Sequence, residues 1–436
     1  MTHNSIYRLC HKKLSIIIGL FLLPCLVSAN NTPVVSSVQE PSLQQLFMLG
    51  LENSPAIQYA LAQQSSALNN QKVVDSFLQP EVRFQSELSY AWMEKQSYAR
   101  TASQLQASYP LYQPDREDRS SIASYQSLER KFQLEEAKQA LWLSVSTLYF
   151  NYWTQKAEQT FLQKDFESIN EIMEQVKQRF TIGYQDLNDI SDIQARLDRN
   201  RADLIRIEQN LHMTEIELES VLGISIDLSK FPPPPPLSSE INLEFKQDDL
   251  SKLVRQHPAL LRYEQVLLAS HKQVEYEKNK DGIVVQAFSV LVNNQSDGYF
   301  YDDMQAVKLG LKLTVPIYIG NRISASVAKA RSESNQISAL KRQKKLLLEA
   351  SFQNAIESLQ HNQKRLVALE RVLDSNKQAL VAAENGLITG NRNILDLLDA
   401  QRNLHRAERD IAILTNRLWS NWYLYQRSTG NISVLS

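Results

Sequence analysis

The sequence predicts a mainly helical protein with a β-barrel part, built from a duplicated module of long coiled-coil helices and β-hairpins. Three observations support this fold class. Two stretches of more than 60 residues contain no glycine, two pairs of short runs alternate apolar and polar residues, and the stretch 183–223 recurs as 390–430. A repeat at a distance of 207 positions is too long for a solenoid unit of about 20–50 residues. It indicates two copies of one large module.

The repeat contains nine identities among its 41 aligned positions. The identical pairs are Gly183/Gly390, Asp189/Asp396, Asp192/Asp399, Gln194/Gln401, Leu197/Leu404, Arg199/Arg406, Asp203/Asp410, Leu211/Leu418 and Gly223/Gly430. They start at a glycine and continue into a heptad-like helix, so the prediction places a turn and the following helix at the same place in each copy.

The first 29 residues have the features of a secretory signal peptide. A basic start precedes the apolar run Leu14–Leu23, and Val27–Ala29 has the small residues of a cleavage site. The apolar run is too short for a membrane-spanning helix. Both cysteines, Cys10 and Cys25, lie in this segment, so the mature chain is expected to have no disulfide and no thiol nucleophile or ligand.

The mature chain is mildly acidic. Removal of residues 1–29 takes away three basic and no acidic residues, which leaves 44 Lys and Arg against 48 Asp and Glu, a net charge of −4. This balance argues against a nucleic-acid partner. We find no nucleophile–base pattern, phosphate loop or metal-ligand cluster in the sequence, so we expect neither an enzyme nor a cofactor.

The first copy, residues 30–231, is expected to begin with a helix over 42–78, followed by strands over 81–92 and 102–111. In the first strand, one face is apolar and the other polar, which is the period-two pattern of a strand with two different environments. The apolar residues are Val82, Phe84, Leu88, Tyr90 and Trp92. The polar link between the runs predicts a hairpin, and Pro110 is expected to end the second strand because proline cannot donate to a ladder.

A glycine-free segment over 115–180 predicts a helix of 66 residues, about 100 Å long. Gly183 breaks it, and a second helix is expected over 186–221. Apolar residues recur every seven positions in this second helix, which predicts a left-handed supercoil against partner helices. They are Ile190, Leu197, Leu204, Leu211 and Leu218, with counterparts Leu397, Leu404, Ile411, Leu418 and Tyr425.

The second copy, residues 247–436, repeats this order. Its expected elements are a helix over 247–279, strands over 284–292 and 306–317, a long helix over 323–385, a break at Gly390 and a helix over 393–426. The Pro-rich linker 232–246 separates the copies, and its five consecutive prolines predict a stiff extended spacer.

The lengths of the elements predict a quaternary structure. Two shorter helices can stack end to end beside each long one, which gives a rod about 100 Å long with strands at one end and glycine turns at the other. Four strands cannot close a barrel in a membrane, where each unpaired backbone group costs several kcal/mol, and closed barrels need at least about eight strands. Two chains would close only a narrow barrel, too small to continue into a ring of many helices. Three chains would supply twelve strands, so we expect a homotrimer with a 12-stranded barrel joined to an α-helical barrel.

The sequence resembles the outer membrane efflux protein family, of the TolC-like type. The most specific matches are the run Gly390–Gln401 after the second turn and the strand-ending motifs Pro110–Tyr112 and Pro316–Tyr318. The resemblance covers nearly all of the mature chain. It implies a trimeric channel-tunnel, with a barrel in the lipid of the Gram-negative outer membrane and helices in the periplasm. It further implies a periplasmic adaptor (membrane fusion) protein and an inner-membrane pump, either an ABC exporter or a proton-driven one.

The resemblance also implies roles for residues at the glycine turns, which form the periplasmic tip in this family. The implied residues are Asp396 and Asp399 for a carboxylate ring at the pore constriction, Asp189 and Arg392 for contacts that hold the tip gate closed, and Gly183 and Gly390 for the tip turns and adaptor docking.

The sequence leaves open what the aspartates at the turns do. Asp189, Asp192, Asp396 and Asp399 follow helix breaks, where acidic residues stabilise a helix N-terminus by about 0.3–1 kcal/mol, so capping alone is an alternative explanation for some of them. The chain also departs from the family pattern at Leu387, which replaces a tyrosine, and at Asn188, which replaces a threonine. Fewer polar links are therefore expected at the gate.

We expect the protein to be the exit duct of a tripartite efflux pump or of a type I secretion system, gated at its periplasmic tip. The alternative is a structural periplasmic coiled-coil protein without channel activity. The sequence leaves the cargo and the class of pump open.

Overall fold

The computed structural model describes residues 43–93, 96–183, 186–235, 254–297 and 303–428. The predicted signal peptide, residues 236–246 of the predicted linker and residues 247–253 of the predicted second copy lie outside the described residues. The described residues all belong to one compact unit, within Pro41–Ser436. No helix among them is both long and apolar enough to span a membrane.

The first half of the chain contains helices on both sides of a hairpin. Its elements are α1 (Leu43–Asn53), α2 (Pro55–Ser76), β1 (Glu81–Met93), β2 (Gln96–Tyr112), α3 (Arg116–Thr181) and α4 (Leu187–Leu222). The second half repeats the order helix, hairpin, long helix, helix. Its elements are α6 (Pro258–Asn279), β3 (Val284–Ser296), β4 (Met304–Thr314), α7 (Arg322–Ile388) and α8 (Ile394–Ser428), and the short 3-10 helix η1 (Leu228–Lys230) follows α4 at the end of the first half.

The two long helices confirm the prediction from the glycine-free segments, since α3 has 66 residues and α7 has 67. The helix expected over 42–78 is wrong as a single element, because it divides at Ser54. Pro55 has no N–H to continue the ladder and occupies the start of α2, while Ser54 takes an extended conformation. His257 and Pro258 start α6 in the same way, with His257 Nδ1 accepting a hydrogen bond from Ala259 N–H at 3.1 Å.

The strands are longer than expected at their hairpin ends. β2 begins at Gln96 rather than at residue 102. The expectation that Pro110 ends this strand is also wrong, because pairing continues to Tyr112 with a register shift between Pro110 and Tyr112. Such a bulge accommodates a residue that lacks an N–H donor. β4 ends at Thr314, just before the Val315–Pro316 segment.

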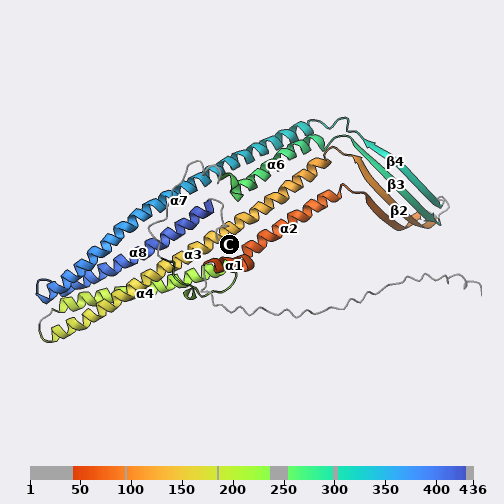
Figure 1. Cartoon of the computed structure of the whole chain (residues 1–436). Helices are drawn as coiled ribbons and strands as arrows, with labels where there is room; N and C mark the ends of the chain where they lie inside the picture. Colours follow the sequence, from red (N-terminus) through yellow and green to blue (C-terminus); the bar gives the residue numbers. More distant parts are fainter. Residues whose placement is uncertain (1–42, 94–95, 184–185, 236–253, 298–302, 429–436) are drawn as a thin grey trace, which may run out of the picture. The chain divides into compact units, whose positions relative to one another are not determined.

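All four strands form one antiparallel sheet in the order β1-β2-β3-β4 (Figure 1). The two central strands come from different halves of the chain, and Leu105 of β2 lies opposite Leu291 of β3. Within the described residues, β1 and β4 each pair on one side only. Their outer edges are therefore free to pair with strands of another chain.

The long helices organise the rest of the unit. α2 and α4 both contact α3, while α6 and α8 both contact α3 and α7. Each long helix starts a few residues after a strand and ends at a glycine turn, as Figure 1 shows. The length of α3, about 100 Å at 1.5 Å per residue, therefore separates the sheet from the turns.

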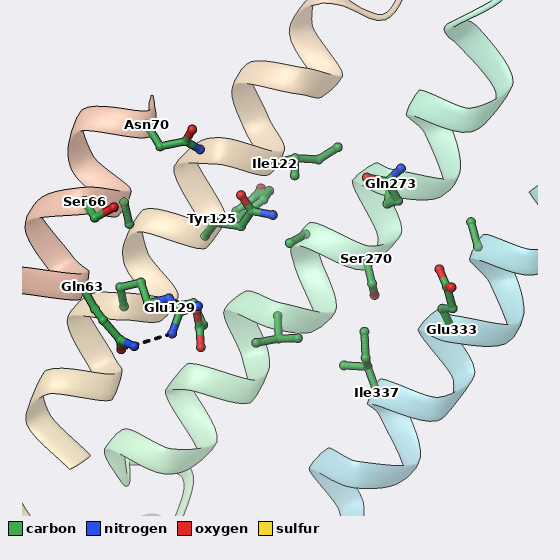
Figure 2. A pocket seen from close by; sticks show the side chains of 16 residues that line it. Gln63, Ser66, Asn70, Ile122, Tyr125, Glu129, Ser270, Gln273, Glu333 and Ile337 are labelled. Atoms are coloured by element: carbon green, nitrogen blue, oxygen red, sulfur yellow. Dashed lines mark hydrogen bonds and ion pairs between the residues drawn. The ribbon is translucent and has the colours of Figure 1, made fainter. Parts of the chain in front are cut away.

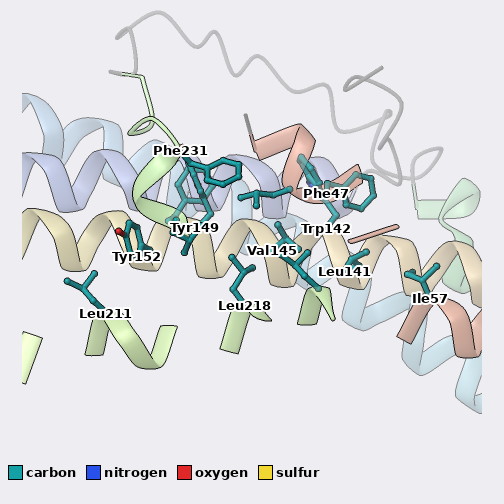
Figure 3. Packing of buried hydrophobic residues seen from close by; sticks show 14 of the residues in the cluster. Phe47, Ile57, Leu141, Trp142, Val145, Tyr149, Tyr152, Leu211, Leu218 and Phe231 are labelled. Atoms are coloured by element: carbon teal, nitrogen blue, oxygen red, sulfur yellow. The ribbon is translucent and has the colours of Figure 1, made fainter. Parts of the chain in front are cut away.

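Aromatic and aliphatic side chains together form the largest buried cluster of the described residues, on α3 and its neighbours (Figure 3). Trp142 is 1% exposed and meets Phe47 of α1 edge-on, with ring centroids 4.8 Å apart. The cluster also holds the start of the proline-rich segment. Tyr149 Oη donates a hydrogen bond to the carbonyl of Pro232, and Trp419 Nε1 donates one to the carbonyl of Pro235 at 2.7 Å. These aromatic residues thus pack helices together and hold residues 232–235 of the proline-rich segment against them.

Burial raises the pKa of Tyr149 and of Tyr152 from 10 to about 12. The unfolded chain releases these phenolic protons from about pH 10, whereas the folded chain keeps them to about pH 12. We therefore expect stability to be unaffected by these groups below pH 10 and to fall as the pH rises from 10 to 12. An absorbance titration of phenolate formation should show these tyrosines ionising late, and Tyr149→Phe should remove one late step. Ionisation of every tyrosine near pH 10 in folded protein would contradict this.

Candidate functional site

The two glycine turns have the same unusual backbone. Gly183 has φ 79° and Gly390 has φ 77°, both in the left-handed region that favours glycine. A Cβ added at either position would meet no atom of the described residues within 4 Å, the two chain neighbours left aside. Glycine is thus required there by the backbone angle, and the described part of the chain leaves the space beside both glycines open.

An apolar cluster behind the turns, here called the tip cluster, joins helices from both halves of the chain. Its buried residues are Ile169, Ile172, Met173 and Val176 of α3, Ile193 and Leu197 of α4, and Ile394 and Leu398 of α8. Leu387 of α7 packs against it together with Phe166, Ile190 and Leu395. The tip cluster therefore makes the two turns one packed end of the molecule, and the leucine at position 387 contributes apolar contact there.

Asp396 forms a reciprocal cap with Asn393 at the start of α8. Its Oδ2 accepts a hydrogen bond from Asn393 N–H at 3.0 Å, while its own N–H donates to Asn393 Oδ1 at 2.7 Å. This is the geometry of a capping box, which satisfies two N–H groups that a helix start leaves unpaired. In the single chain, Asp396 therefore has a capping role, as the sequence left open.

Asp399 lies one turn further along α8 and pairs with a cation from the other half of the chain. Arg196 Nη1 of α4 donates to Asp399 Oδ1 at 2.5 Å. The Asp399 side chain is 55% exposed, so this ion pair is reached by solvent. Exposed pairs contribute little to stability, typically below about 1 kcal/mol, which leaves the carboxylate available to ions near the tip.

Arg392 and Asp189 lie on the two sides of the tip. The Arg392 stem covers Gly386, where an added Cβ would lie 2.9 Å from Arg392 Cγ. The N–H of Arg392 donates to the Gly386 carbonyl at 3.1 Å. Asp189 is half-buried in the first turn of α4, and next to it Asn188 Nδ2 donates to Asp186 Oδ2 at 2.9 Å.

Three residues of the tip were missed by sequence reasoning: Arg196, Asn393 and Gly386. The capping partner could have been found, because Asn393 stands three positions before Asp396, which is the spacing of a capping box. Gly386 could have been suspected as the first glycine after a long glycine-free segment, and it lies in the last turn of α7. Arg196 could not, since it is 203 positions away from Asp399 and no local pattern connects them.

The sheet has one apolar and one polar face, here named the apolar face and the polar face. On the edge strands, the apolar face is formed by Val82, Phe84, Leu88, Tyr90 and Trp92 of β1 and by Val307, Leu309, Leu311 and Leu313 of β4. These side chains are more than half exposed in the single chain, with Trp92 and Leu88 at 80%. An apolar surface of this extent is expected to face lipid or another protein.

A half-open groove of about 710 Å³ lies between α2, α3, α6 and α7 (Figure 2). Its lining is mainly polar and small, and Arg130 on its wall donates to Gln63 at 3.4 Å. Among the described residues, no group of three or more His, Cys, Asp or Glu side chains is placed to hold a metal ion. The groove belongs to the helical wall and lies apart from the tip residues.

A sheet with an exposed apolar face that leads directly into helices of 66 and 67 residues defines a class of bacterial outer membrane channel proteins with a periplasmic helical part. The chain belongs to the outer membrane efflux protein family, whose pattern it matches over residues 47–224 and 254–425. It is an outer membrane protein that extends into the periplasm.

Similar proteins cover nearly the whole chain. Outer membrane protein TolC of Vibrio cholerae is 24% identical over 417 residues, which is 90% of this chain and 91% of TolC. The crystal structure of CusC, which forms a transmembrane channel, gives a TM-score of 0.79 at 16% identity. The match covers 91% of this chain and 96% of CusC. The outer membrane protein VceC from Vibrio cholerae gives 0.77 at 17% identity, covering 89% of this chain and 96% of VceC. The proteins that this chain resembles are channel proteins and not enzymes.

Proposed function

We propose that three copies of this chain form a gated exit duct across the outer membrane, serving a tripartite efflux pump or a type I secretion system. The observation that carries the proposal is the four-stranded sheet, with an exposed apolar face and two edges, β1 and β4, that lack a second partner within the described residues. Open edges in lipid cost several kcal/mol for each unpaired backbone group. Pairing β4 of one copy with β1 of the next removes both edges and closes twelve strands.

The apolar face also separates this proposal from a structural periplasmic coiled-coil protein. A periplasmic protein would expose the apolar residues of β1 and β4 to water, whereas a barrel turns them toward lipid. Purified protein should migrate as a heat-modifiable trimer and give single-channel conductance in planar bilayers. A dimeric mass in detergent would contradict the closure of twelve strands by three copies. Folded trimers without conductance would favour a structural periplasmic protein over a duct.

At the tip, we propose that Asp396 and Asp399 from three copies form the carboxylate ring of the constriction. Rings of acidic side chains attract cations. The exposure of Asp399 supports this role, while Asp396 would combine it with capping α8. Asp189 and Arg392 would contact neighbouring helices to hold the gate. The open space around Gly183 and Gly390 supports docking of a periplasmic adaptor, which would connect the duct to an inner-membrane pump.

Isosteric substitutions separate the two roles of Asp396. Asp396→Asn combined with Asp399→Asn removes the charge, and the amide introduced at position 396 would keep an oxygen that accepts from Asn393 N–H. We expect this variant to lose cation selectivity and block by polyvalent cations, as measured by reversal potentials in a salt gradient. Asp396→Ala removes the cap as well and should lower stability by about 1 kcal/mol. Unchanged selectivity in the double amide variant would mean that these carboxylates only stabilise the protein.

A further inference from the structure

The polar face of the sheet carries a cluster of residues that the tip gate does not use. Gly310 in β4 lies directly opposite Phe288 in β3. A Cβ on Gly310 would be 2.9 Å from Phe288 Cζ and 3.2 Å from Cε1, so the ring occupies the space that a side chain at position 310 would fill. Phe288 is half-buried and keeps part of its surface open. Glycine thus allows the aromatic ring to lie over β4, on a face where β3 also carries Val290 and Val292 and β4 carries two lysines.

Two lysines flank this ring. Lys308 and Lys312 stand two residues before and after Gly310, so all three share the polar face. At about 3.4 Å per residue, their Cα atoms lie about 7 Å on either side of Gly310, within reach of a lysine side chain. Both are exposed. In the next strand, Gln286 lies opposite Lys312 and can donate an amide hydrogen bond to the same position.

The polar face carries an excess of positive charge. Among the described strand residues, its cations are Arg83, Arg100, Lys308 and Lys312, and its acids are Glu81 and Glu87. Glu81 is paired with Arg83 at 2.5 Å. The excess of positive charge therefore lies toward the β3–β4 side, where the aromatic ring is.

We propose that Phe288, Lys308, Lys312 and Gln286 form a binding site for aromatic organic anions on the inner wall of the barrel. The ring of the ligand would stack on Phe288 while its carboxylate is shared by the lysines and the Gln286 amide. The proposal rests on the trimeric duct, because only barrel closure turns the polar face toward a water-filled lumen. A passive duct needs such sites to be weak, so that cargo enters and leaves. Three copies give three equivalent sites. We therefore expect aromatic anions to be one class of cargo that passes through the duct.

Two readouts on purified full-length mature trimers test this site. The first is equilibrium binding of 2-naphthoate, followed by its fluorescence anisotropy, with hexanoate as the aliphatic competitor. The second is block of single-channel current by 2-naphthoate added from the barrel side. We expect 2-naphthoate to bind and to block at lower concentration than hexanoate by about fivefold, because only the aromatic anion stacks.

Substitutions then assign the site. Lys308→Gln with Lys312→Gln should weaken binding and block by about tenfold through loss of two cations. Phe288→Leu should remove the preference for 2-naphthoate over hexanoate. Arg83→Gln is the matched control, since it removes a cation of the same face that is already paired with Glu81, and binding should be unchanged.

Failure of the site and failure of the duct give different results. Normal conductance with equal 2-naphthoate binding in wild type and in the double lysine variant would overturn the site and leave the duct intact. Absence of conductance with lysine-dependent binding would overturn the duct and the placement of the site in a lumen, and would keep only the binding of the anion by these residues. Equal weakening by Arg83→Gln would also overturn the site, because it would indicate a diffuse charge effect.

Discussion

Phe84→Arg is expected to prevent stable insertion of the barrel, and the adjacent substitution Gln85→Arg is expected to be tolerated. Phe84 is 67% exposed on the apolar face, opposite Leu105 of β2. An arginine that faces lipid near the bilayer midplane costs about 2–4 kcal/mol, and three copies in a trimer multiply this cost. Gln85 points to the polar face, where an arginine would be hydrated in the lumen.

Folding into lipid vesicles, followed by the heat-modifiable band shift and by denaturant titration, measures this difference. Phe84→Arg should lower the folded fraction strongly, and Gln85→Arg should remain close to wild type. Equal behaviour of the two variants would mean that the apolar face does not contact lipid. Phe84→Leu serves as a second control because it removes the ring and keeps an apolar side chain, so it should fold.

The sequence was sufficient for the parts of the fold that depend on local patterns. Glycine-free segments predicted α3 and α7 nearly to the residue, and period-two alternation found all four strands. The break at Ser54 is also local, because Pro55 is a residue type that favours the first position of a helix. Local patterns failed where two distant segments decide the outcome, as in the bulge that lets β2 pass Pro110 while pairing with β3.

The tip illustrates the same limit. The heptad pattern in α8 predicted the seam Leu397, Leu404, Ile411, Leu418 and Tyr425. Leu418 is buried as expected, at 2% exposure, but Leu397, Leu404 and Ile411 are half-buried, and Leu398 and Leu414 are buried in their place. α8 packs against both α3 and α7, so its buried stripe is set by two partners at once. Which face each partner covers depends on contacts between the two halves of the chain, and no periodicity within α8 contains that information. The half-buried seam leucines remain available for contacts between copies in a trimer.

Leu398→Ala is expected to open the tip more effectively than any substitution of a charged residue there. Leu398 is 1% exposed and lies in the tip cluster, where it connects α8 with α3 and α4. Large-to-small changes at such buried positions cost about 2–5 kcal/mol, whereas the exposed Asp399–Arg196 pair is worth below about 1 kcal/mol. If opening separates α8 from this cluster, the cost falls mainly on the closed state.

Single-channel recording and passive entry of a large antibiotic measure the effect. A loss of about 1.4 kcal/mol from the closed state alone raises the open population about tenfold, so Leu398→Ala should raise resting conductance at least this much. Leu397→Ala is the matched control, being the same change at the adjacent half-buried position, and Leu398→Met should stay closed because it conserves volume. Folded Leu398→Ala trimers with wild-type resting conductance would show that the gate is held elsewhere. Arg196→Ala would then be the decisive variant. If it opens the channel and Leu398→Ala does not, the ion pair between Arg196 and Asp399, and not apolar packing, holds the gate closed.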